Sequence, residues 1–106
     1  MSNHRKNMTA AARRDDILSA AVRLSATKGY LHVTREDIAL AACCSPALVS
    51  NCLGTMVQLR RAIMGAAIAD KVLPIIAQGL AAKDKRAQKV PMELQQAALA
   101  TLVRPA

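Results

Sequence analysis

The side chains suited to catalysis or metal binding are few in this chain of 106 residues. Its three cysteines are Cys43, Cys44 and Cys52, and His32 is the nearest histidine. Their spacing matches no paired Cys/His pattern of a zinc site, and adjacent cysteines are poorly placed to ligate one metal. Cys44 is therefore predicted to be a core residue, with metal or redox sensing as the minor alternative. No Ser-His-Asp set, carboxylate pair or glycine-rich phosphate loop is present, so we expect no enzyme activity, metal or cofactor.

The strongest local signals lie in residues 34–53, TREDIALAACCSPALVSNCL. Thr34 and Asp37 have the spacing of a capping box, which starts a helix. Ser45-Pro46 pairs a preferred N-cap with the residue favoured at the first helical position, so a second helix begins there and Gly54 ends it. The residues predicted to face inward are Ile38, Ala39, Ala42, Cys44, Val49 and Leu53. Two short helices joined by a tight turn, the second with a polar outer face, are typical of a helix-turn-helix DNA reader.

Charge indicates a polyanionic partner. The net charge is +8, from fifteen Lys and Arg against seven Asp and Glu. The sequence has no acidic residue between Asp37 and Asp70, so the second helix carries no carboxylate to repel phosphate. Nucleic acid is favoured over an acidic protein or a membrane as the partner. The alternative is a basic protein with no such partner.

Composition favours an all-α fold. Tyr30 is the one aromatic residue, and four glycines and four prolines are too few for a turn-rich β fold. A core of Ala, Leu, Ile, Val and Met suits packed helices better than sheets. No apolar run reaches the roughly 18 residues that a membrane span needs, and the N-terminus lacks the apolar core of a signal peptide. Three cysteines make a poor disulfide framework, so we expect a cytoplasmic protein.

Helical periodicity predicts about five helices, over 13–28, 34–42, 45–53, 55–73 and 91–102. Asp15 and Asp16 should occupy the first turn of the first helix, and Gly29 should end it with a positive φ. Pro74 should kink or end the fourth helix, which continues after the kink to about residue 82. Residues 83–89, KDKRAQK, are predicted to be a solvated connector. Residues 1–12 are predicted to be a flexible basic arm, either disordered or in contact with DNA.

Residues 13–64 resemble the N-terminal DNA-binding domain of tetracycline-repressor-type (TetR family) regulators. The matching features follow in order: ILSAAVRLSATKGY (17–30), Val33-Thr34 before the second helix, Ser45-Pro46 at the third, and Gly54-Thr55 with Leu59 at the fourth. The sequence departs from the family at Cys43, where glycine is usual, and at Ser50, Cys52 and Leu53, where Tyr, His and an aromatic are common. Met56 stands at the start of the fourth helix, where the family usually has a lysine. The resemblance implies a bacterial protein associated with the nucleoid through DNA.

The resemblance also assigns roles to individual residues. It implies base contacts from Arg35, Pro46, Ala47, Ser50 and Asn51. Asparagine suits adenine and arginine suits guanine, while Pro46 and Ala47 offer apolar contact to a thymine methyl. Phosphate contacts are expected from Thr34, Ser45, Cys52, Thr55, Arg60, Arg5 and Lys6. Two alternatives stay open: an ordinary polar face for Ser50 and Asn51, and an ion pair of Arg35 with Glu36 or Asp37.

Residues 65–106 are predicted to be a helical dimerisation region. They are too short for the ligand-binding domain of the family, so we expect no small-molecule ligand. The expected interface residues are Ile68, Val72, Ile75, Ile76, Leu94, Leu99 and Leu102. The sequence thus predicts a homodimeric repressor that binds an inverted repeat in double-stranded DNA. The alternative is a helical protein-interaction module, such as an anti-repressor or polymerase-binding factor, that kept the fold but lost base reading.

Overall fold

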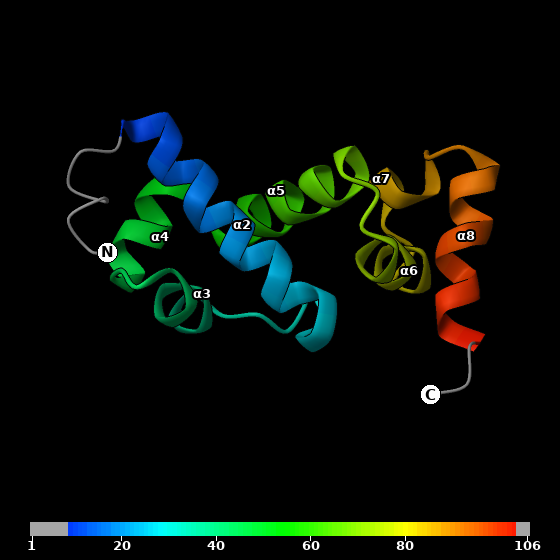
Figure 1. Ribbon diagram of the computed structural model, residues 1–106, viewed down its shortest axis with the longest axis horizontal. Coiled ribbons are helices and arrows are strands. Elements are labelled where there is room, and N and C mark those ends of the chain that lie inside the picture. The colour runs from blue at the N-terminus through cyan, green and yellow to red at the C-terminus, as the bar shows by residue number, and fades with distance from the viewer. Residues whose placement is uncertain (1–8, 104–106) are drawn as a thin grey trace.

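The computed structural model describes residues 9–103, which fold into seven helices without a strand among them (Figure 1). The all-α prediction is confirmed, but the predicted count of about five helices is too low. The helices are α2 (Ala10–Lys28), α3 (Arg35–Ala42), α4 (Pro46–Leu53), α5 (Met56–Ala69), α6 (Leu73–Ala81), α7 (Lys85–Gln88) and α8 (Met92–Val103).

Helix α2 begins earlier than predicted. Thr9 is its N-cap, and the Thr9 hydroxyl accepts a hydrogen bond of 3.1 Å from the N–H of Ala12. Residues 10–12, predicted to belong to a flexible arm, are therefore helical, because a threonine cap followed by three alanines is a strong helix start. Asp15 and Asp16 consequently lie beyond the first turn, which contains no acidic residue. Gly29 ends the helix with φ of 100°, as predicted.

The predicted helix over 55–73 is two helices. Helix α5 ends at Ala69, and Lys71 takes a left-handed φ of 55°. The N–H of Val72 returns to the carbonyl of Ala67 at 2.8 Å, which closes the end of α5. Pro74 then lies in the first turn of α6, where its missing N–H costs nothing. Proline starts a new helix here and does not kink an existing one. The predicted connector 83–89 likewise contains a helix, α7.

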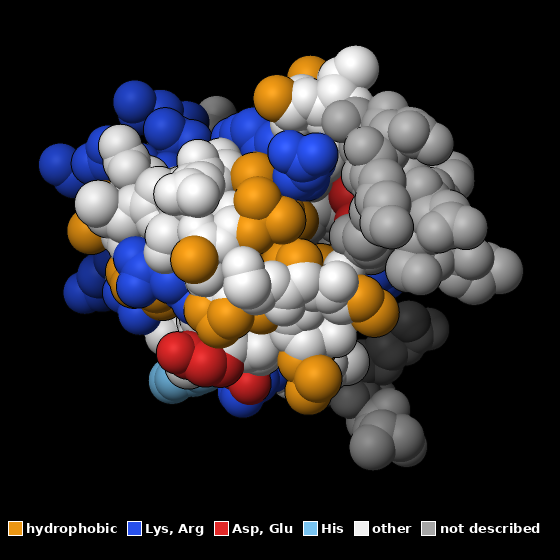
Figure 2. All heavy atoms as spheres, turned by 90° about the vertical axis from the view of Figure 1, so that its left-hand side faces the viewer, with side chains coloured by type: hydrophobic (Ala, Val, Ile, Leu, Met, Phe, Trp, Pro, Cys, Tyr) orange, Lys and Arg blue, Asp and Glu red, His pale blue; other side chains and the backbone are white. Residues whose placement is uncertain are grey.

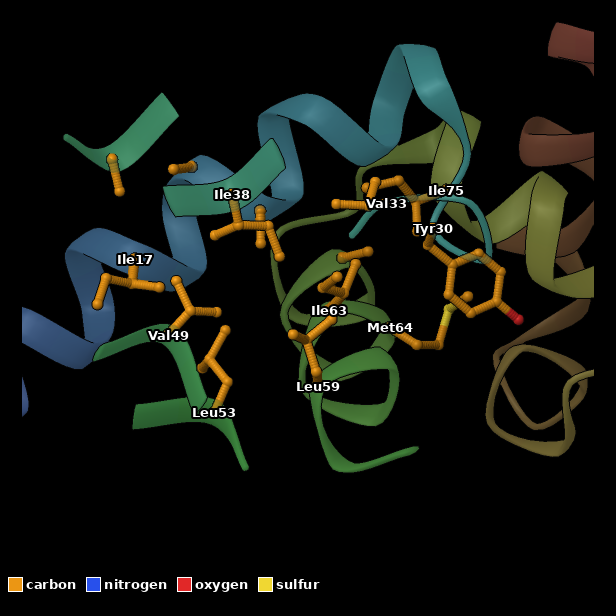
Figure 3. Close-up of a cluster of buried hydrophobic side chains, with 14 of the residues drawn as sticks. Ile17, Tyr30, Val33, Ile38, Val49, Leu53, Leu59, Ile63, Met64 and Ile75 are labelled. Atoms are coloured by element: carbon orange, nitrogen blue, oxygen red, sulfur yellow. The ribbon is translucent and has the colours of Figure 1, made fainter. Parts of the chain in front are cut away.

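One hydrophobic cluster holds α2, α3, α4 and α5 together (Figure 3). Ile17 from α2, Ile38 from α3 and Val49 from α4 are fully buried in it, as are Leu59 and Ile63 from α5. The predicted inward residues Ala39, Ala42 and Leu53 are buried as well, while Cys44 is half-buried. The helical periodicity of the sequence therefore identified the inner faces of the two short helices correctly.

A smaller second cluster joins α6 to α8. Its buried members are Ile76, Ala77, Val90 and Ala98. The predicted domain boundary at residue 64 falls within α5, and Ala67 and Ile75 beyond it belong to the main cluster. The buried core is thus continuous across that position.

Polar side chains connect α6 and α7 to the end of α2. The Gln78 side chain accepts a hydrogen bond from the N–H of Tyr30 and donates one to the carbonyl of Ser25, both at 2.8 Å. The Tyr30 hydroxyl donates to Asp84 at 2.8 Å. Burial, followed by the bond to Asp84, raises the pKa of Tyr30 well above its usual value, so its hydroxyl stays protonated as a donor.

Candidate nucleic-acid interface

Helices α3 and α4 are held at their starts by the predicted caps. The Thr34 hydroxyl accepts from the N–H of Asp37 at 3.1 Å, and the Asp37 carboxylate accepts from the N–H of Thr34 at 3.1 Å. The Ser45 hydroxyl accepts from the N–H of Leu48 at 3.2 Å, and Pro46 follows as the first residue of α4. The turn between the helices passes through Cys43, whose φ of 57° and ψ of 48° are left-handed.

The outer face of α4 carries the small residues expected there. Pro46, Ala47 and Asn51 are exposed, and Ser50 is half-buried. Figure 2 shows this end of the molecule, with uncharged atoms in white and orange across its centre, Lys and Arg side chains to the left and above, and the most prominent acidic group near the lower edge. A phosphate backbone approaching α4 therefore meets no carboxylate on this helix.

Arg35 makes a contact within the chain that the sequence did not indicate, and its expected base contact stays a prediction. Its guanidinium Nη2 donates to the carbonyl of Gly54 at 3.4 Å, so it reaches from the start of α3 to the end of α4. Within residues 9–103 it forms no ion pair with Glu36 or Asp37, and Asp37 pairs with Lys28 at 2.6 Å. The alternative of an ion pair between Arg35 and Glu36 or Asp37 is therefore not realised in this structure. The half-buried Arg35 side chain positions the two helices relative to each other.

Three capping hydroxyls lie exposed at helix starts, at Thr34, Ser45 and Thr55. Each oxygen accepts a backbone N–H bond; that of Thr55 comes from Gln58 at 3.2 Å. A hydroxyl that accepts in this way keeps its own O–H as a donor. Each cap can thus stabilise its helix and donate to a phosphate oxygen at once, which is the chemistry expected of these residues.

The other expected phosphate contacts differ in accessibility. Cys52 is half-buried and packs against the main hydrophobic cluster. Arg60 donates from Nη2 to the carbonyl of Leu31 at 3.3 Å, which draws it toward the loop after α2. Arg5 and Lys6, together with the rest of residues 1–8, lie outside the described part of the chain.

The expected dimer residues divide into two groups. Ile75 and Ile76 are fully buried within the single chain, so their side chains are unavailable to a second copy and that assignment needs correction. They are buried because α6 lies between α5 and α8 and packs against both. Ile68, Val72 and Leu94 are half-buried, whereas Leu99 and Leu102 are 43% and 57% exposed on α8. Ile68 and Leu94 also line an open hollow of about 440 Å³.

The cysteines and histidine considered for metal binding do not form a site in the described residues. Cys43, Cys44 and Cys52 form no disulfide with one another. Among residues 9–103, no group of three or more His, Cys, Asp or Glu side chains is arranged to hold a metal ion. None of the described helices has both the length and the apolar character to cross a bilayer.

The sequence did not indicate two polar connections between distant elements, one between α3 and the end of α4 and one between α6 and the end of α2. The Arg35–Gly54 contact spans nineteen positions, and the Gln78–Tyr30 contact spans forty-eight. Periodicity and capping motifs report only on neighbours a few residues apart, so they carry no signal for such pairs. Comparison of the chain with protein-family models, curated proteins and solved structures found no significant match.

Proposed function

We propose that this protein is a sequence-specific, double-stranded DNA-binding transcriptional repressor of the TetR type, with α3 and α4 as its helix-turn-helix. The observation that carries the proposal is the outer face of α4, which is free of carboxylates and exposes Ala47 and Asn51. Both of its flanking helices are firmly capped, so this face is presented on a rigid support.

In the proposed complex, the outer face of α4 lies in the major groove. Asn51 donates and accepts hydrogen bonds at an adenine edge, Ser50 contacts a neighbouring base, and Ala47 packs on a thymine methyl. Thr34 and Thr55 donate to backbone phosphates on either side. Arg35 holds the end of α4 in place from its contact with Gly54. Its role in specificity is therefore to position α4.

The protein acts as a homodimer in this proposal, because one short recognition helix reads too few base pairs for tight binding. The exposed apolar residues Leu99 and Leu102 on α8 form the contact between copies. Two α4 helices related by a two-fold axis would read an inverted repeat with half-sites about 10 base pairs apart. Repression follows from occupation of a promoter by the dimer.

Selection of bound sequences from a random pool of DNA duplexes tests the proposal. The intact protein should enrich an inverted repeat. Asn51→Ala should relax the preference at one position per half-site by about 1–3 kcal/mol, and Ser50→Ala should weaken an adjacent one. Ser19→Ala, an exposed serine on α2, is the matched control and should leave the enriched sequence unchanged. Enrichment of no sequence at all would refute base reading.

A second candidate function is a protein-interaction module, and Leu40 and Val57 favour it. They are large apolar side chains that are 84% and 58% exposed on α3 and α5, so both are open to a partner. A module of this kind would bind a partner through these residues and show no base preference. A clear base preference of the unmodified protein that Leu40→Ser leaves unchanged would count against this alternative, because a module of this kind would show no base preference.

A further inference from the structure

The short helix α7 and its neighbours form a basic surface far from α4. We call it the α7 surface and define it by five exposed cations: Lys83, Lys85, Arg86 and Lys89 around α7, and Arg61 on α5. Figure 1 places α4 and α7 toward opposite ends of the molecule, with α5 running between them. The sequence predicted this segment to be a solvated connector. The fold instead fixes it as an ordered helix packed against α5 and α6.

The local fold turns the cations outward and the one carboxylate of this segment inward. Ala87 is fully buried, which sets the rotation of α7 and leaves its basic residues on the outside. Asp84 caps α7, accepting from the N–H of Arg86 at 2.8 Å, and its other oxygen accepts from the buried Tyr30 hydroxyl at 2.8 Å. The Asp84 carboxylate is thus occupied by a cap and a core hydroxyl.

Arg86 is held in place before any partner binds. Its Nη1 donates to the carbonyl of Arg61 at 3.2 Å. The same nitrogen lies 3.5 Å from where a Cβ on Gly65 would be, so the guanidinium rests across the bare backbone of α5. This contact brings Arg86 beside the turn that carries Arg61. The remaining N–H groups of Arg86 are left for an acceptor outside the chain.

The positive charge of the α7 surface is not balanced by nearby ion pairs. In the described part of the chain, none of its five cations has a carboxylate oxygen within 4 Å, and the Lys28–Asp37 ion pair lies elsewhere, at the junction of α2 and α3. Exposed like charges repel one another over about one Debye length, roughly 8–10 Å, and a bound anion reduces this repulsion. A polyanion would relieve this repulsion and release its own counterions.

The chemistry of the surface selects among polyanions. Tyr30, the one aromatic residue of the chain, is buried, so the surface has no ring on which unpaired bases could stack. The apolar residue of α7, Ala87, is also buried, so α7 has no apolar face to insert into a membrane. Lysines on a short helix suit the regularly spaced phosphates of a duplex.

We propose that the α7 surface binds the phosphate backbone of duplex DNA without reading its sequence. This inference shares its partner, DNA, with the proposed function, but it does not require base reading by α4. The surface would contribute the general electrostatic attraction, while α4 would contribute the sequence preference. Because the two lie toward opposite ends of the molecule, their effects on binding are separable by substitution.

The test compares two double variants of the full chain that remove the same charge. Lys85→Gln with Lys89→Gln neutralises part of the α7 surface, and Arg23→Gln with Lys71→Gln neutralises two exposed cations elsewhere. Binding to a labelled random-sequence duplex is measured by fluorescence anisotropy over a range of salt concentrations. The α7 variant should bind more weakly, and its slope of log K against log salt should be shallower by about 1.8, or about 0.9 for each lost phosphate contact. The control should keep the slope of the unmodified protein.

The inference is overturned if the two double variants have the same salt slope, provided that circular dichroism shows both folded. It is also overturned if the α7 variant loses binding to phosphatidylserine vesicles while its DNA binding is unchanged. Asn51→Ala separates this inference from the proposed function. A changed slope in the α7 variant with no sequence preference in any variant would support the inference and refute base reading. If the α7 variant keeps the salt slope and Asn51→Ala loses the sequence preference, the inference is refuted and base reading is supported.

Discussion

Three residues other than glycine hold a left-handed backbone within residues 9–103. Cys43, Lys71 and Lys83 have φ of 57°, 55° and 60°, and they follow α3, α5 and α6. After each helix, two N–H groups turn back to carbonyls of the last turn, as in a Schellman motif; at α3 these bonds run from Cys44 to Ala39 and from Cys43 to Leu40. The lysines place their charge near a helix C-terminus, where the helix dipole favours it. Cys43 has no such compensation.

Cys43→Gly should therefore stabilise the protein. A side chain in the left-handed region costs about 1–2 kcal/mol, part of which glycine loses again through its greater freedom when unfolded. We expect the free energy of unfolding in urea to rise by about 1 kcal/mol. Ala41→Gly, at an exposed position within α3, is the control and should lower it by about 1 kcal/mol. Equal losses from both substitutions would show that the turn does not strain Cys43.

The capping box at Thr34 should make stability depend on pH. The Lys28 hydrogen bond first, then the Thr34 N–H, hold the pKa of Asp37 below its ordinary value of 3.8. A lowered folded-state pKa stabilises the protein above the unfolded value and loses this effect as pH falls through the folded value. Asp37→Asn should thus lower the free energy of unfolding at neutral pH, and this difference should shrink below about pH 4.

Urea denaturation at several pH values measures the effect of Asp37→Asn. Lys28→Gln is the partner variant, and Asp37→Asn should cost less in its background because the ion pair is already gone. High salt should reduce the same difference, since both side chains are partly exposed. If Asp37→Asn lowers the free energy of unfolding by the same amount at every pH, the negative charge of the carboxylate is not the cause of the loss.

At the scale of elements, two glycines in helices have opposite surroundings. A Cβ on Gly79 in α6 would lie 2.8 Å from the Cβ of Ala87 in α7 and 2.5 Å from the terminal methyl of Met64 in α5. A Cβ on Gly65 in α5 would meet only the Arg86 guanidinium, at an ordinary 3.5 Å. Glycine at residue 79 is therefore required for close packing of three helices, whereas at residue 65 it is not.

Gly79→Ala and Gly65→Ala form a matched pair with opposite expected signs. Alanine raises helix propensity by up to about 1 kcal/mol at both positions. At residue 79 the overlap with Ala87 should outweigh this gain, so stability should fall by about 1–3 kcal/mol. At residue 65 stability should rise by about 0.5–1 kcal/mol. Thermal melting of both variants gives the signs, and a rise at residue 79 would show that α7 moves away from α6 without cost.

The whole molecule is elongated, and its dimensions follow from the way α8 is attached. The radius of gyration is 14.4 Å, against about 13 Å for a compact domain of this length. The extents are 42 × 28 × 20 Å. Helix α8 packs mainly on α6, which leaves Leu99 and Leu102 exposed. The proposed dimer would cover these residues.

Leu99→Lys with Leu102→Lys should convert the proposed dimer to a monomer. The two lysines of one copy would be buried against the same two lysines of the other copy, with no carboxylate introduced to pair them. Association should therefore be lost. Sedimentation equilibrium measures the change in mass. Leu40→Lys, a more exposed leucine on α3, is the control and should leave the mass unchanged. A monomeric unmodified protein would refute the dimer directly.

The sequence by itself determined the all-α class, the helix starts at Thr34, Ser45 and Thr55, and the inner faces of the two short helices. Caps and apolar periodicity depend on residues three or four positions apart, so they can be read without the fold. Tertiary structure alone decided that Arg35 reaches Gly54, that Ile75 and Ile76 are core residues, and that Gln78 joins α6 to α2. It also fixed the α7 surface, because the inward turn of Asp84 depends on Tyr30, which lies fifty-four residues earlier in the chain. Contacts between distant residues depend on how the helices pack, and no local pattern encodes that packing.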